Sequence, residues 1–266
     1  MLISHETPLQ MMDQSRTYND YDYALVHLFE TNPKYYQFFK TSLAAGREVL
    51  LDNSIFELGT AFDAKKFYNY ILDLNPSYYV VPDVLEDAQQ TIVSFLNWEN
   101  NHDMTPIKHI PKIGVVQGKT YEELATCYAF MNEKADYIAI SFDYSYYQQS
   151  ALGKNKLEKC RNGRVKFIKD LIYDDIWDES KPHHLLGCAL PDEFKEYNCR
   201  VTSAIRSIDT SNPVVAGMHN IRYIPKIGLV DKLSVKLCDL IDASLSSTNV
   251  NNVLYNVKQF RTLNNL

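Results

Sequence analysis

The stretch that decides the fold begins at residue 48, where short apolar runs alternate with longer segments: EVLLD (48–52), FDAKKFYNYILDL (62–74), SYYVVPD (77–83), DAQQTIVSFLNWENN (87–101) and KIGVVQG (112–118). Continuous apolar runs are typical of strands buried on both faces. The longer segments have helical periodicity. This alternation of strand and helix predicts a parallel sheet covered by helices.

The same alternation continues on both sides of this stretch. Further strands are predicted at YALVHLF (23–29), DYIAISFD (136–143), HHLLGCAL (183–190) and VTSAIRSID (201–209). Further helices are predicted at KYYQFFKTSLAAG (34–46), TYEELATCYAFMNEKA (120–135), PDEFKEYN (191–198), DKLSVKLCDLI (231–241) and VNNVLYNVKQFRTL (250–263). Seven or eight such units in this length predict an α/β fold of the (β/α)8 TIM-like barrel type.

The chain is predicted to be a single domain over residues 1–266, because no linker rich in Pro, Ser or Gly divides it. Residues 144–182 are too long for one crossover and are interpreted as an insertion after the fifth strand. Thr120 and Pro191 stand where helices are predicted to begin.

Composition excludes several classes of protein. The 266 residues are 45% hydrophobic and carry a net charge of −6, which does not fit a non-specific coat of nucleic acid. With only 9 glycines, the chain has neither a dinucleotide-binding nor a P-loop motif. Five scattered cysteines predict neither a disulfide framework nor a zinc site, and no other metal or cofactor is expected: Cys127, Cys160, Cys188, Cys199 and Cys238. With no targeting or membrane segment in the sequence, we expect a cytoplasmic protein, in the host cytoplasm if the chain is phage-encoded.

Polar residues recur at the carboxyl ends of the predicted strands: Asp52, Asp83, Gln117, Ser141 and Asp209. In a (β/α)8 barrel these ends form the face that carries the active site. Any single Asp here is equally compatible with a turn or an N-cap. Together, the carboxylates predict acid–base or covalent carboxylate chemistry, in which neighbouring carboxylates push their pKa values apart.

Two strings in the first half of the chain resemble motifs of the tRNA-guanine transglycosylase superfamily. DNSIFE (52–57) resembles its D-S-G-G-[FY]-Q motif, with Asp52 and Phe56 in register. GVVQG (114–118) resembles its G-I-V-Q-G.

Two further strings follow in the family's order. HLLG (184–187), continuing through PDE (191–193), resembles its Y-L-M-G-V-G-T-P-E-D segment. DTSNP (209–213) then lies where the family has its D-C-V-x-P nucleophile segment. Order and spacing agree over roughly residues 45–218, so the sequence resembles this superfamily in four motifs.

The resemblance implies a (β/α)8 enzyme that breaks the bond between guanine and the sugar of a polynucleotide, holds the sugar on an aspartate and installs a 7-deazaguanine base. It implies that Asp209 is the nucleophile and Asp52 the general acid/base. The residues that it implies for binding the base are Phe56, Asp83, Gln117, Gly118, Ser141, Leu186 and Gly187. A flat purine needs an aromatic face and a few hydrogen-bonding groups in an apolar slot, which these residue types provide.

The sequence departs from the family at several positions. Ser54 and Ile55 stand at its two glycines, Glu57 stands at its glutamine, and the paired glycines of its fifth strand are Ile140 and Ser141. The C-x-C-x-x-C zinc site of the tRNA enzymes is absent from the sequence. The chain therefore resembles the compact, zinc-less phage and bacterial branch that modifies DNA, and DNA is favoured over tRNA as the acceptor. The partners expected are a polynucleotide, a 7-deazaguanine base such as a preQ0-like molecule, and either a second copy of the chain or a helper protein.

A cluster of seven basic residues lies in the predicted insertion: Lys154, Lys156, Lys159, Arg161, Arg164, Lys166 and Lys169. Such a cluster could neutralise the phosphates of a bound polynucleotide. It is equally compatible with the solvated face of a helix.

Other features of the sequence leave two further functions open. A non-catalytic subunit would retain the fold and the basic cluster and only position nucleic acid for another protein. A hydrolase of free nucleosides would need the carboxylates but not the basic cluster. The adjacent His183 and His184 are interpreted as structural, since neighbours on a strand face opposite sides, and Cys188 as a buried small side chain.

Overall fold

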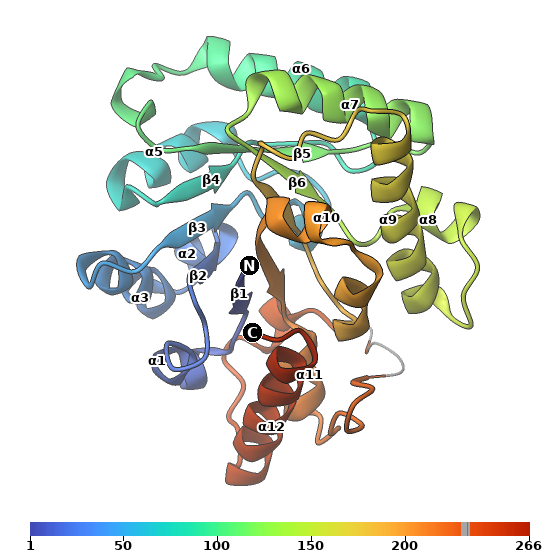
Figure 1. The fold of residues 1–266 in the computed structure, drawn as a ribbon. Coiled ribbons are helices and arrows are strands. Elements are labelled where there is room, and N and C mark those ends of the chain that lie inside the picture. The colour runs from blue at the N-terminus through green and yellow to red at the C-terminus, as the bar shows by residue number, and fades with distance from the viewer. Residues whose placement is uncertain (230–232, 234) are drawn as a thin grey trace. The chain divides into compact units, whose positions relative to one another are not determined.

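The computed structural model describes residues 1–229, 233 and 235–266. Eight strands form one sheet in the order β1-β8-β7-β6-β5-β4-β3-β2 and alternate with helices (Figure 1). Every strand pair with a defined register is parallel. The fold class is therefore α/β of the (β/α)8 TIM-like type, which confirms the prediction.

The strands are β1 (Leu2–His5), β2 (Asp22–Leu25), β3 (Val49–Asp52), β4 (Tyr78–Val80), β5 (Lys112–Val116), β6 (Tyr137–Ile140), β7 (His183–Leu185) and β8 (Ile205–Thr210). The α-helices are α1 (Met12–Ser15), α2 (His27–Thr31), α3 (Pro33–Ala44), α4 (Ile55–Leu58), α5 (Ala64–Leu74), α6 (Ala88–Asn101), α7 (Tyr121–Lys134), α8 (Ser145–Ser150), α9 (Lys156–Tyr173), α10 (Cys199–Ala204), α11 (Asn212–Met218) and α12 (Ser247–Leu263). Short 3-10 helices are η1 (Leu9–Met11), η2 (Thr105–Ile107), η3 (Pro191–Glu196) and η4 (Leu237–Leu240).

The contacts within the chain divide it into two compact units. Unit 1 comprises residues 1–20, 142–179 and 185–266, and unit 2 comprises residues 21–141 and 180–184. The prediction of a single domain over residues 1–266 stays a prediction.

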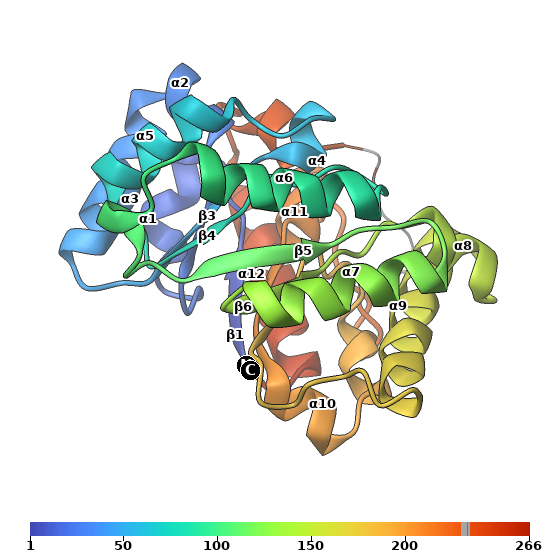
Figure 2. The same ribbon diagram turned by 90° about the horizontal axis from the view of Figure 1, so that it is seen from above.

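In unit 2, strands β2 to β6 pair in sequence order, and α6 and α7 run side by side along the same face of β5 (Figure 2). The helices begin where side chains cap them. Asp63, Asp87 and Thr120 each accept a hydrogen bond from the backbone N–H three residues further on, which satisfies a donor at the start of the helix. Thr120 therefore marks a helix start, as the sequence predicts.

In unit 1, β1 pairs with β8 in a register that sets Leu2 opposite Ser207. Helices α11 and α12 pack closely at Gly217. A Cβ at this position would lie only 2.4 Å from the backbone nitrogen of Val253, so a larger residue would not fit. A cluster of buried apolar residues surrounds this contact: Met11, Val214, Val215, Leu237, Val253 and Val257. The predicted insertion contains α8 and α9, which pack on each other where Gly163 leaves room for Tyr147.

Several predicted boundaries are wrong. The strand expected over 23–29 ends at Leu25, and α2 follows it. The strand expected over 201–209 begins only at Ile205, because the residues before it belong to α10, which Asn198 caps. The strand expected over 183–190 ends at Leu185, because Gly187 adopts a left-handed backbone with φ of 64°. The helix expected over 191–198 is the 3-10 helix η3. The strand β1 was not predicted.

The helix expected over 231–241 lies partly outside the described residues, and its described part is helical only in η4. The C-terminal helix expected over 250–263 is confirmed and begins earlier, at Ser247, with a Ser246 capping box. Across the described residues, no helix has the length and apolar character needed to cross a bilayer.

Candidate functional site

The first group of predicted site residues lies in unit 2, at the end of β3. Asp52 is the last residue of this strand and is 7% exposed. Ser54 adopts a left-handed conformation with φ of 62°, which few residues other than glycine favour. Its N–H donates a hydrogen bond of 2.6 Å to Oδ1 of Asp52. The backbone after β3 therefore orients the carboxyl group of Asp52.

The environment of Asp52 favours its protonated form. Burial raises the pKa of this carboxyl group well above its usual range, and the negative charge of Glu57 raises it further. Hydrogen bonds from the Ser54 N–H and the Tyr23 hydroxyl act in the opposite direction and are outweighed. A carboxyl group whose pKa is raised by burial is suited to general acid/base catalysis.

Asp83 and Gln117 are brought together in unit 2, as the sequence predicts. Asp83 is 2% exposed and accepts hydrogen bonds from the side-chain amides of Asn53 (2.8 Å) and Gln117 (2.6 Å). The side-chain oxygen of Gln117 accepts a 2.8 Å bond from the N–H of Glu86. Burial raises the pKa of Asp83 in spite of the two amide donors. Part of the hydrogen-bonding capacity of both side chains is thus already used within the protein.

Three further predicted residues lie at strand ends of unit 2. Gly118 follows β5 and is crowded, since a Cβ there would lie 2.8 Å from the Cβ of Glu123, in the first turn of α7. Ser141 directly follows β6 and is partly exposed. Phe56, in α4, is 46% exposed, which is unusual for a large apolar ring.

The remaining predicted site residues lie in unit 1. Asp209, in β8, is 4% exposed and accepts hydrogen bonds from the Gly187 N–H at 3.1 Å and 3.2 Å, one to each carboxylate oxygen. The backbone oxygen of Asp209 accepts a 2.9 Å bond from the Cys188 N–H. Asp209 and Gly187 are therefore in contact, and Leu186 belongs to the turn between them and β7.

One predicted residue is in the wrong place for its predicted role. Arg164 was assigned to a polynucleotide surface, but its side chain is fully buried and forms a two-pronged ion pair with Glu193 at 2.8 Å and 2.7 Å. A buried guanidinium group cannot reach the phosphates of a polynucleotide. Cys188 is fully buried as predicted, and burial raises the pKa of its thiol.

The other basic residues of the cluster lie in or just before α9, and four of them are close to acidic side chains. Lys156 lies 3.0 Å from Asp143, Arg161 lies 3.5 Å from Asp192, and Lys169 lies 3.8 Å from Glu196. Lys166 pairs with Asp170. These acidic neighbours reduce the positive potential of the surface, so a role in binding nucleic acid stays a prediction for Lys154, Lys156, Lys159, Arg161, Lys166 and Lys169.

Sequence reasoning missed the role of the residues that surround the carboxylates. Tyr23 bonds to Asp52 and stacks on His184, with ring centroids 6.1 Å apart. His183 bonds to the hydroxyl of Tyr128 at 2.9 Å, so both histidines have structural contacts. Tyr23 lies in a predicted strand, but nothing in the sequence indicates which of its residues face the carboxylates.

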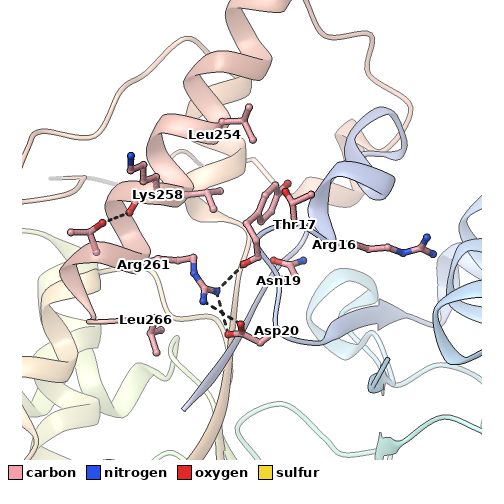
Figure 3. A pocket seen from close by; sticks show the side chains of 11 residues that line it. Arg16, Thr17, Asn19, Asp20, Leu254, Lys258, Arg261 and Leu266 are labelled. Atoms are coloured by element: carbon pink, nitrogen blue, oxygen red, sulfur yellow. Dashed lines mark hydrogen bonds and ion pairs between the residues drawn. The ribbon is translucent and has the colours of Figure 1, made fainter. Parts of the chain in front are cut away.

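A pocket of about 580 Å3 lies elsewhere in unit 1, between the residues after α1 and α12 (Figure 3). Its main charged contact is Arg261, whose guanidinium bonds to both oxygens of Asp20 at 3.2 Å and to the carbonyl oxygen of Tyr18 at 2.8 Å. None of the predicted site residues, all of which are among the described residues, lines this pocket. It is a feature separate from the strand-end carboxylates.

Comparison with known proteins adds no assignment to this geometry. No protein-family model matches the chain, and no curated protein matches it with significant similarity. Any functional conclusion therefore depends on the chain's own residues and fold.

Proposed function

We propose that this chain is a nucleic-acid guanine transglycosylase, which exchanges guanine for a 7-deazaguanine base in DNA through a covalent bond between Asp209 and the sugar. The observation that carries the proposal is that buried carboxylates stand at the carboxyl ends of strands: Asp52 ends β3, and Asp209 is the penultimate residue of β8. In (β/α)8 enzymes the catalytic residues come from the carboxyl ends of several strands.

The backbone at the motif positions supports the resemblance on which the proposal draws. Ser54 stands at the first family glycine after Asp52 and has a left-handed φ of 62°. Gly187 also has a left-handed φ, and Gly118 has no room for a Cβ. At three motif positions, then, the chain has a backbone that glycine accommodates best.

In the proposed first step, a carboxylate oxygen of Asp209 attacks C1′ of the target nucleotide. The bond between C1′ and the base breaks, its electron pair goes to the base nitrogen, and Asp52 donates a proton to the departing guanine. The raised pKa of Asp52 supports this role, because the group must carry a proton before the bond breaks.

In the proposed second step, the incoming 7-deazaguanine gives its ring N–H proton to Asp52 and attacks C1′. The bond between Asp209 and the sugar breaks, and the carboxylate of Asp209 is restored. Two displacements at the same carbon retain its configuration.

Recognition of the base is assigned to unit 2. Phe56 would stack on the purine with its exposed ring. Asp83 would accept from the ring N–H and exocyclic amine of guanine, and Gln117 would use its remaining amide hydrogen for the opposite edge. The resemblance implies that Gly118 and Ser141 contribute backbone groups and that Leu186 and Gly187 contact the base.

A base-exchange assay tests the proposal. Purified protein is incubated with labelled guanine and either DNA or tRNA, and a panel of 7-deazaguanines is then offered. We expect label in DNA, and we expect Asp209→Ala to reduce exchange by roughly four orders of magnitude or more, as removal of a nucleophile does. The adduct between protein and DNA that survives denaturation should disappear with it.

Asp13→Ala is the matched control, because Asp13 lies in the same unit and its side chain is 95% exposed. Exchange in tRNA alone would correct the acceptor. Undiminished exchange by Asp209→Ala would overturn the nucleophile assignment. Binding of DNA without exchange would indicate the non-catalytic subunit.

A second candidate is a hydrolase of free nucleosides. The observation that favours it is the pairing of Lys156, Arg161, Lys166 and Lys169 with acidic side chains, which weakens the case for a polynucleotide surface. The same assay distinguishes it, because a hydrolase would release ribose from guanosine and would incorporate no labelled base.

A further inference from the structure

We infer that Arg164 is a positioning residue for Asp209 and acts through a single peptide group, the one that joins Leu186 to Gly187. The inference rests on the proposed function in that it takes Asp209 as the nucleophile. All the contacts that carry it lie within unit 1.

The peptide group has a hydrogen bond on each side. Its carbonyl oxygen, that of Leu186, accepts a 2.7 Å bond from Nη1 of Arg164. Its N–H, that of Gly187, donates to both carboxylate oxygens of Asp209 at 3.1 Å and 3.2 Å. Because a trans peptide is planar and rigid, its C=O and N–H point in opposite directions, and fixing the oxygen fixes the direction of the N–H.

The charge of Arg164 adds to this geometric effect. A cation at the carbonyl oxygen draws electron density from the peptide group, which makes the N–H a stronger donor, and successive hydrogen bonds strengthen one another in a buried environment. The Gly187 N–H is thereby both aimed at the carboxylate of Asp209 and polarised toward it.

The position of Arg164 is itself fixed from several sides. Its guanidinium forms the ion pair with Glu193, contacts the sulfur of Cys188 at 3.1 Å and lies 4.9 Å from the ring centre of Phe142. Tyr197 donates a 2.7 Å bond to Glu193. A planar five-donor group can satisfy these acceptors together, and the ammonium of a lysine cannot.

The turn is held at its other end as well. Asn212, at the start of α11, donates a 2.7 Å bond to the carbonyl oxygen of Ala189. With the Cys188 N–H bonded to the backbone of Asp209, residues 186–189 are fixed on both sides of Gly187. Loss of the bond from Arg164 to Leu186 would therefore release the orientation of one peptide group, while these bonds still hold the rest of the turn.

The test uses the full chain labelled with 15N-glycine. Only nine glycines contribute signals, and the Gly187 amide is assigned by its disappearance in Gly187→Ala. In Arg164→Lys we expect the Gly187 amide proton to move upfield and to exchange faster with solvent, because its hydrogen bond to Asp209 weakens. The double variant Arg164→Met/Glu193→Gln, which leaves no unpaired buried charge in the pair, should show the same change and keeps the test valid if Arg164→Lys does not fold.

Tyr197→Phe is the matched control, since it removes one hydrogen bond from Glu193 and leaves the bond between Arg164 and Leu186 intact. Its Gly187 signal should stay in place. In the exchange assay, Arg164→Lys should lower kcat by about 10- to 100-fold, as misplacement of a reacting group does, with KM unchanged.

The outcomes separate the two claims. A shifted Gly187 signal with no base exchange by any variant, parent included, supports the linkage and overturns the proposed function. Base exchange by the parent with an unmoved Gly187 signal and an unchanged kcat in Arg164→Lys overturns the positioning role. A parallel rise in KM would also overturn it, because it would place Arg164 in substrate binding.

Discussion

The carboxylates of unit 2 and the carboxylate of unit 1 are buried to similar extents but are held by different kinds of group. Asp83 is bonded to two neutral amides and Asp52 to a hydroxyl and a backbone N–H, and burial raises the pKa of both. Asp209 is bonded to a peptide N–H whose other side contacts a buried cation, Arg164. In both carboxyl groups of unit 2 the neutral donors do not outweigh the effect of burial on the pKa. At Asp209 a cation, Arg164, contacts the far side of the peptide group that donates to the carboxyl oxygens.

Removal of the buried cation of unit 1 should have the largest effect on the free energy of unfolding. Arg164→Met leaves Glu193 buried without its cationic partner, and we expect the free energy of unfolding to fall by about 3–5 kcal/mol in urea denaturation. Adding Glu193→Gln should recover part of the loss. A loss below about 1 kcal/mol would show that the pair contributes little to holding unit 1 together.

A smaller effect is expected from removal of a neutral donor in unit 2. Gln117→Met takes away the amide that bonds to Asp83 and the acceptor of the Glu86 N–H, and it should cost about 1–3 kcal/mol in the same measurement. Gln89→Met, on the exposed face of α6, is the control and should change stability by less than about 0.5 kcal/mol. Equal effects of the two substitutions would contradict the assigned network.

The raised pKa of Asp52 predicts a stability that depends on pH. The pKa of Asp52 is raised in the folded state, so ionisation opposes folding once the pH exceeds the value of about 3.9 in the unfolded chain. Asp52→Asn removes this cost, and thermal denaturation should show a higher midpoint than the parent at pH 7 and no difference near pH 3. Asp13→Asn, at an exposed site, should show no such dependence. An equal gain at both pH values would show that the cause is packing and not charge.

The smallest effect is expected at Gly187. Its left-handed φ should make Gly187→Ala cost roughly 1 kcal/mol, since the nearest atom to the added Cβ, in Phe142, is 3.6 Å away and leaves room for it. Gly46→Ala in unit 2 is the matched substitution, because Gly46 also has a left-handed φ and open space around it. An additional loss at Gly187 over Gly46 in urea denaturation would measure the disturbance of the hydrogen bond to Asp209.

The alternation of apolar runs and helical segments was sufficient to predict the fold class, and β3, β5 and β6 all lie within the predicted strands. The strand β1 was missed because its residues, LISH, do not form a continuous apolar run. The end of β7 was missed because the sequence does not show that Gly187 turns the chain.

The sequence was sufficient to predict which polar residues stand at strand ends, but not which side chains surround them. Asp83 and Gln117 stand at strand ends that the sequence indicates, and they are in contact. Asp209 contacts Gly187, which the sequence placed inside a strand. The burial of Arg164 was not predicted, because its basic neighbours in the sequence suggested an exposed charged surface. Its spacing contained a signal, because Cys160, Arg164 and Ile168 repeat every four residues and share the buried face of α9.

The pairing of β1 with β8 has a consequence for how the chain folds as it is synthesised. The backbone of Leu2 lies opposite Ser207, so β1 cannot make this strand pairing until about two hundred further residues have left the ribosome. At typical rates of translation this takes roughly ten to forty seconds. The strands β2 to β6 of unit 2 can pair with their neighbours as they emerge, whereas β1, the first strand to be made, pairs with a strand that is synthesised much later.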